Sequence, residues 1–294
     1  MFKKATGLIL FLICALFIFQ TVKGNENWQQ LCNQVLGQIK NIPIYKWFFL
    51  LFLMIINFFV ESLKWFRLIK NNNQIQFGNT FKSVMVGQAF AFFTPNRMGE
   101  YLGRILYLDK GSKMQGAAQM AWSSFAQLIV TLCIGSMAIL FYTPIYPSLR
   151  WISPLLGVVT LFFYFYKIPF LDRFTAWSLI QIKTSIKVDL LLLSLGRYLI
   201  FSFQYLWVAN ILNLPIESDQ IFVAVSILFL CLSILPTISV TELVVRGQLL
   251  IFILAPIYTD SIRILSLSSI IWLINFLIPS IIGAFILIGY RYKQ

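Results

Sequence analysis

Long runs of apolar residues recur along the whole chain. A membrane-spanning helix needs about 20 mostly apolar residues. Runs near this length occupy residues 5–20, 44–60, 114–141, 151–166, 190–212 and 262–290. No small-x-small cleavage site follows the first run, so we expect it to be an uncleaved span and not a signal peptide. The pattern predicts an all-α membrane protein with about six full transmembrane helices.

Two further apolar regions contain a proline break. Residues 81–108 are interrupted at Thr94-Pro95-Asn96-Arg97, and residues 221–257 at Leu235-Pro236-Thr237. The second region would form a helix of about 55 Å, whereas one membrane crossing needs about 30 Å. Proline removes a backbone donor and breaks the helix. We predict that both regions are broken, re-entrant hairpins, although two short full crossings in each region would fit the same pattern.

Composition and charge narrow the class of protein. Hydrophobic residues make up 59% of the chain and charged residues only 11%, which excludes a soluble globular domain. The net charge is +13, but the cations are spread between the apolar runs, where they mark the cytoplasmic side of a membrane. This distribution does not indicate a nucleic-acid partner. With a cytoplasmic N-terminus, 14 of the 23 basic residues lie inside and five outside, which predicts that both termini are cytoplasmic.

The sequence lacks the residues that several kinds of catalytic site require. The chain has no histidine, which removes the usual base of serine and cysteine nucleophiles and the commonest zinc ligand. The four cysteines form no Cys-x-x-Cys pair, and there is no Gly-rich phosphate loop. We therefore expect no metal and no cofactor, and we do not expect an enzyme.

The two breaks carry similar charged residues. Glu100 follows Pro95 by five residues and Glu242 follows Pro236 by six, and in each case an arginine, Arg104 or Arg246, comes four residues after the glutamate. Each break lies between two predicted spans, which defines half-repeats at about 44–141 and 187–290 within a single membrane domain of residues 1–294. The spans at 5–20 and 151–166 fall outside the repeat. Because the halves begin on opposite sides of the membrane, we predict an inverted repeat whose broken helices form a site near the midplane.

A glutamate and an arginine four residues apart share one helix face and can pair, which lowers the cost of placing them in a membrane. Guanidinium groups and helix N-termini both suit a phosphate. The predicted headgroup site comprises Pro95, Asn96, Arg97, Gly99, Glu100, Arg104, Arg197, Pro236, Thr237, Glu242 and Arg246. Three alternatives stay open: solvated ion pairs at the interface, helix packing by Gly99 and Gly103, and snorkelling of Arg197 to the cytoplasmic surface.

Four stretches of the chain, at residues 61–69, 94–104, 195–204 and 235–247, resemble the transmembrane domain of the lysylphosphatidylglycerol synthase family of flippase-like integral membrane proteins. The family pattern of a proline, then Gly-Glu, then arginine matches Pro95, Gly99, Glu100 and Arg104. The second motif has Ile-Ser-Val-Thr at 238–241 in place of the glycine-rich form. The resemblance implies a bacterial-type inner-membrane protein with two re-entrant segments that handles lipids.

The resemblance implies that this chain binds or translocates a phospholipid or lipid-linked molecule between leaflets. We do not expect lysyl transfer, because only residues 291–294 follow the last span, where the two-domain members carry a soluble transferase domain. Two alternatives remain open. One is an integral transferase that uses a lipid-linked donor, with Glu100 or Glu242 as acid or base. The other is a non-catalytic partner of a cell-envelope enzyme. A homodimer is equally compatible with the sequence.

Overall fold

A computed structural model describes residues 39–70, 75–94, 97–109, 112–142, 147–166, 182–235 and 239–291, together with Asn33, Leu36 and Gly37. Within these residues every regular element is a helix. The all-helical prediction is confirmed for this part of the chain. The predicted span at 5–20 lies outside the described residues, as do Pro95, Asn96, Pro236 and Thr237.

The predicted spans and broken regions that fall within the described residues correspond to helices or helix pairs. The helices are α3 (Ile44–Ile69), α4 (Phe77–Phe92), α5 (Gly99–Ile105), α6 (Lys113–Phe141), α7 (Pro147–Phe165), α9 (Thr184–Ile211), α10 (Ser218–Ile234), α11 (Ser239–Leu254), α12 (Ser261–Trp272), the π-helical η4 (Leu273–Leu277) and α13 (Ile278–Arg291). Both proline-containing regions are indeed interrupted, the first between α4 and α5 and the second between α10 and α11.

Among the described residues, three helices are long and apolar enough to cross a membrane. They are α3, α6 and the continuous helix formed by α12, η4 and α13. The helices α7 and α10 contain shorter apolar stretches, Ser153–Phe165 and Ser218–Ile234. The helix α9 is one residue shorter than α6 and carries Arg197 and Gln204 within its apolar run. Length and composition thus support three of the six predicted crossings.

Helix α3 shows how the chain separates its polar and apolar residues. Its apolar run predicts a span that ends near residue 60, but the helix continues to Ile69. Glu61 and Lys64 lie in this extension, and the Lys64 side chain is only 1% exposed. Both of these charged side chains of α3 are therefore buried within the protein. The opposite side of α3 exposes a stripe of large apolar side chains: Phe48, Phe52, Ile55 and Phe59.

Glycines allow the backbone of α4 to contact the backbones of two other helices directly. A Cβ added to Gly103 would overlap with the backbone of Gly87, and one added to Gly99 would overlap with the carbonyl of Phe90. On the other side of α4, a Cβ on Gly283 of α13 would overlap with the Met85 carbonyl. The packing interpretation of Gly99 and Gly103 is therefore confirmed.

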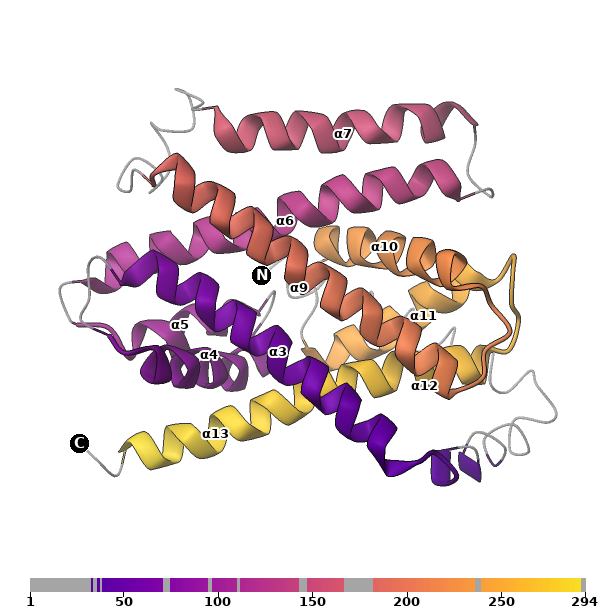
Figure 1. The fold of residues 1–294 in the computed structure, drawn as a ribbon, viewed down its shortest axis with the longest axis horizontal. Helices are drawn as coiled ribbons and strands as arrows, with labels where there is room; N and C mark the ends of the chain where they lie inside the picture. Colours follow the sequence, from indigo (N-terminus) through magenta and orange to yellow (C-terminus); the bar gives the residue numbers. More distant parts are fainter. Residues whose placement is uncertain are drawn as a thin grey trace.

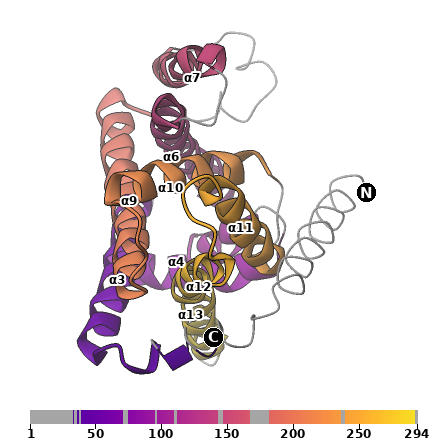
Figure 2. The ribbon, with the colours of Figure 1, turned by 90° about the vertical axis from the view of Figure 1, so that its right-hand side faces the viewer.

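The two interrupted helix pairs lie toward opposite ends of the molecule (Figure 1). The pair α4 and α5 lies toward the end where α13 finishes, and α10 and α11 lie toward the end where α12 begins (Figure 1). Helices α3 and α9 pack side by side and cross the molecule diagonally (Figures 1 and 2). Helix α7 lies at the outer edge, packed on α6 (Figure 2).

Candidate functional site

A cavity of about 420 Å³ lies at the centre of the helices. This volume is within the range of small-molecule binding sites. Its walls come from α3, α4, α5, α6, α9, α10, α11 and η4. Among the described residues, the charged side chains of the lining are Glu61, Lys64, Arg97, Glu100, Arg104, Arg197, Glu242 and Arg246. Five are basic and three acidic, so the described lining carries a formal excess of two positive charges.

Glu61 on α3 is the most heavily shared carboxylate of the cavity. Its Oε1 lies 2.8 Å from Arg104 Nη1, and its Oε2 lies 3.4 Å from Lys64 Nζ. The same Oε2 accepts a hydrogen bond from Arg197 Nη1 of α9. The Glu61 side chain is only 7% exposed. One buried carboxylate therefore joins three cations from three different segments of the chain.

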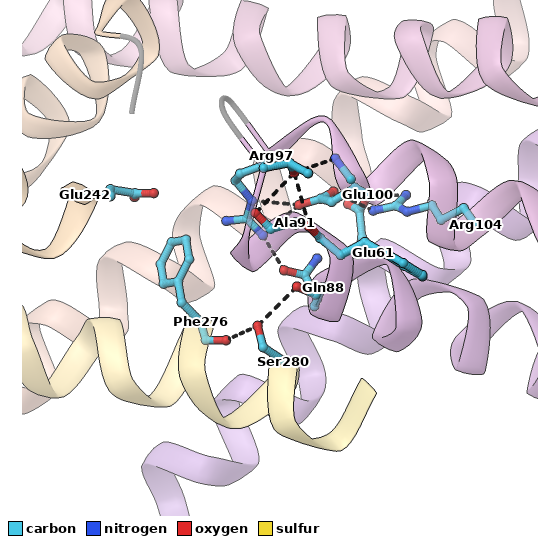
Figure 3. A network of polar contacts seen from close by, with 12 residues as sticks. Glu61, Gln88, Ala91, Arg97, Glu100, Arg104, Glu242, Phe276 and Ser280 are labelled. Carbon is cyan, nitrogen blue, oxygen red and sulfur yellow. Dashed lines mark hydrogen bonds and ion pairs between the residues drawn. The ribbon is translucent and has the colours of Figure 1, made fainter. Parts of the chain in front are cut away.

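Glu100 extends this network toward the first break, as Figure 3 shows. Its Oε2 accepts a hydrogen bond of 3.0 Å from Arg104 Nη2, and its Oε1 lies 2.7 Å from Arg97 Nη2. Arg97 Nη2 also donates a hydrogen bond to the side-chain carbonyl of Gln88 on α4. We refer to Glu61, Glu100 and the cations bound to them as the first charge network.

The backbone at Arg97 has a φ of +57°, in the left-handed region. Residues other than glycine rarely adopt this backbone conformation, and the strain costs of order 1–3 kcal/mol of folding free energy. Two residues on, α5 begins with Gly99, whose N–H donates a 2.7 Å hydrogen bond to Thr94 Oγ1. The strained turn directs the Arg97 side chain into the cavity, where its guanidinium carbon lies 4.7 Å from the centre of the Phe276 ring.

The second break contributes a simpler pair. Arg246 Nη2 donates a hydrogen bond to Glu242 one helical turn earlier on α11, and Arg246 Nη1 donates one of 2.8 Å to the Tyr205 hydroxyl of α9. The Arg246 guanidinium carbon also lies 5.1 Å from the ring centre of Phe276 and 5.8 Å from that of Phe201. Cation–π contacts of this kind add to the stability of a desolvated arginine.

Burial decides two of the alternatives that the sequence leaves open. The side chains of Arg104 and Arg246 are 1% and 4% exposed, so these are not solvated surface ion pairs. Arg197 does not snorkel to a surface. Its Nε donates a 2.8 Å hydrogen bond to Asn57 Oδ1, and its guanidinium pairs with Glu61 inside the cavity.

The structure gathers six of the predicted site residues around one cavity: Arg97, Glu100, Arg104, Arg197, Glu242 and Arg246. Gly99 instead lies in the contact between α4 and α5. Pro95, Asn96, Pro236 and Thr237 lie outside the described residues. The function of the gathered residues in binding a lipid headgroup stays a prediction.

Sequence reasoning missed two important contributors to the site. Glu61 had a usable signal, since Asn57, Glu61 and Lys64 recur at helical spacing and therefore share one face of α3. Phe276 had none, because it is one apolar residue among many in the last apolar run. Its proximity to both breaks depends on how the C-terminal helix packs.

The chemistry of this lining favours the binding of an oxyanion. Guanidinium and ammonium groups form short, charge-assisted hydrogen bonds with phosphate or carboxylate oxygens. Within the described part of the chain, no cluster of three or more histidine, cysteine, aspartate or glutamate residues is arranged to hold a metal ion. Each carboxylate of the cavity contacts at least one arginine.

Comparison with known proteins leaves this site to be interpreted from its own geometry. No family model matches the chain, no curated protein matches it, and no solved structure matches it.

Proposed function

We propose that this chain is a membrane-embedded protein that binds a lipid or lipid-linked molecule by its anionic headgroup and translocates it between leaflets. The observation that carries the proposal is a partly open cavity with a net-positive lining among helices whose outer surfaces are apolar. A charged cavity of this kind provides a polar path for a headgroup, while the acyl or prenyl chains remain among the outward-facing apolar side chains.

The lengths of the interrupted helices support re-entrant hairpins over short crossings. Helix α5 has 7 residues and is therefore about 10 Å long. Helices α4, α10 and α11 have 16, 17 and 16 residues, which corresponds to about 24–26 Å. All are shorter than the roughly 30 Å of a hydrocarbon core. Non-helical backbone is tolerated at this depth when it is buried in protein or lines a cavity.

The placement of the hairpins supports the proposed inverted repeat. Helices α4 and α5 approach the cavity from one end of the molecule, and α10 and α11 from the other (Figure 1). In the proposed orientation the first hairpin opens to the cytoplasm, both termini are cytoplasmic, and the protein resides in a bacterial-type inner membrane. The family suggested by the sequence motifs, that of lysylphosphatidylglycerol synthase transmembrane domains, remains part of this proposal.

Leaflet exchange in proteoliposomes tests the function. The purified chain is reconstituted with a panel of headgroup-labelled lipids and a native lipid extract, and the labelled lipid in the outer leaflet is measured over time. Glu100→Gln and Glu242→Gln each remove one carboxylate from the cavity. We expect exchange to slow by about tenfold or more, as for loss of a charged hydrogen bond.

Glu217→Gln is the matched control, because Glu217 is exposed and lies outside the cavity lining. It should exchange lipid at the wild-type rate. Exchange no faster than in empty liposomes, for every lipid and for the native extract, would contradict translocation and favour a transferase or a partner subunit. Wild-type exchange in both cavity variants would contradict the assignment of the site.

A further inference from the structure

One aromatic ring connects the two breaks. Phe276 is 6% exposed and lies in η4, where the C-terminal helix makes a π-helical turn. The guanidinium carbons of Arg97 and Arg246 lie 4.7 Å and 5.1 Å from the centre of its ring. Arg97 follows the first break and Arg246 follows the second. Figure 3 shows the Phe276 side chain extending from the last helix toward Arg97.

The π-helical turn explains how an apolar residue comes to face the charged cavity. The N–H of Ile278 bonds to the carbonyl of Leu273, five residues earlier. A π-turn inserts one residue into the helical repeat, so it rotates the neighbouring side chains relative to a regular α-helix, and such turns are frequent at functional sites. Helix α13 is held in place beyond the turn by the contact of Gly283 with α4 and by the 3.1 Å hydrogen bond from Ser280 Oγ to the Gln88 carbonyl.

Among the described residues, each arginine has an N–H group without a hydrogen-bond partner. Arg97 engages Nε with Glu100 and Nη2 with Glu100 and Gln88, which leaves Nη1. Arg246 engages Nη1 with Tyr205 and Nη2 with Glu242, while its Nε has no partner in the described part of the chain. A guanidinium group that contacts an aromatic face still has its N–H groups in its own plane, where they remain able to bind a planar or tetrahedral oxyanion.

We propose that Phe276 holds Arg97 and Arg246 as a two-armed clamp for a single oxyanion of the phosphate class, with one arm supplied by each broken hairpin. This proposal rests on the proposed function and assigns the headgroup chemistry that the site selects. The cavity carboxylates do not take part in binding the anion, because each is already neutralised by cations of the protein. The ligand is therefore anionic at the clamp, as a phosphate of a lipid headgroup or as free phosphate.

The clamp is tested by direct binding to the full chain in detergent. Inorganic phosphate and glycerol 3-phosphate are titrated, with binding measured by ³¹P line broadening and by the rise in thermal stability that a ligand of the folded state produces. Acetate and choline are the comparison ions. We expect saturable binding of both phosphates and no saturable binding of choline.

Single-residue variants separate the contribution of the Phe276 ring to phosphate binding from that of the two arginines. Phe276→Leu should weaken phosphate binding by about tenfold, because the cation–π contacts of both arginines are lost. Phe276→Tyr keeps an aromatic face and should bind within about twofold of wild type. Arg97→Lys and Arg246→Lys keep the charges and the fold but lose the planar fork, and each should weaken binding by about tenfold. Phe81→Leu is the control, since Phe81 packs in the core outside the cavity.

The outcomes distinguish this inference from the proposed function. Absence of saturable phosphate binding to the wild-type chain would overturn the clamp, even if the same preparation exchanges lipid in proteoliposomes. Unchanged binding in Phe276→Leu, with weakened binding in both lysine variants, would overturn the role of the ring. Phosphate binding that depends on all three positions would support the clamp, even if no lipid is exchanged. Glycerol 3-phosphate binding without binding of inorganic phosphate would overturn the selection of free phosphate and leave the headgroup as the source.

Discussion

The two interrupted helix pairs, which we propose are re-entrant hairpins, carry similar sequence motifs but are built differently. In the first, α5 packs on α4 through glycines, and Glu100 belongs to a network with Glu61 and several cations. In the second, the ion pair among the described residues is that of Glu242 with Arg246, which also donates a hydrogen bond to Tyr205. A Cβ on Gly247 of α11 would meet the end of the flexible Leu265 side chain and not a backbone atom.

This difference indicates that the first hairpin is a rigid wall of the cavity and the second is easier to displace. Backbone-to-backbone packing and a shared carboxylate restrict α5 to one position. A single ion pair that contacts aromatic rings restricts the position of α11 much less. If the protein alternates between two states, we expect α10 and α11 to move and α4 and α5 to remain fixed.

The largest effect is expected at the carboxylate that the first network shares. Glu61→Gln leaves the buried Arg104 and Lys64 and the partly buried Arg197 with one counter-ion fewer. It should lower the free energy of unfolding by about 3–5 kcal/mol. Glu242→Gln leaves only Arg246 without its counter-ion, and Arg246 keeps its hydrogen bond to Tyr205. The loss of unfolding free energy should therefore be smaller in this variant. Denaturant unfolding in detergent measures both. Equal losses in the two variants would remove the distinction between the hairpins, and the exposed Glu217→Gln serves as control.

Helix packing offers a test of intermediate size. Gly103→Ala places a methyl group against the Gly87 backbone, which cannot give way, and should cost about 1–3 kcal/mol of unfolding free energy. Gly247→Ala is the matched variant on the second hairpin, where the added Cβ would lie 2.7 Å from Leu265 Cδ2. That side chain can rotate, so little change is expected. A loss at Gly247 as large as that at Gly103 would show that both hairpins are packed with equal rigidity.

The smallest effect concerns the one hydroxyl that holds Arg246. Tyr205→Phe removes the acceptor of a 2.8 Å hydrogen bond and should lower the free energy of unfolding by about 0.6–1.7 kcal/mol, the range measured for buried hydrogen bonds in membrane proteins. Tyr101→Phe is the control, because its hydroxyl makes an exposed contact of 3.4 Å with Ser124. A loss in Tyr205→Phe no larger than in this control would mean that Glu242 alone holds the arginine.

Local sequence patterns were sufficient for the helices and for the pairs within them. Apolar runs predicted the helical class, and the two prolines predicted the interruptions that separate α4 from α5 and α10 from α11. The spacing of four residues predicted that Glu100 faces Arg104 and that Glu242 faces Arg246. These features depend on backbone geometry within one or two helical turns, so neighbouring residues determine them.

The tertiary structure alone decided which of these pairs became part of a larger network. Helical spacing places Glu61 on one polar face of α3, but nothing local shows that this face is buried against cations of α5 and α9. The contact of Phe276 with both Arg97 and Arg246 depends on a π-turn and on glycine packing far along the chain. Periodicity determines which residues share a helix face, but long-range packing determines which faces meet, and the cavity exists only where they do.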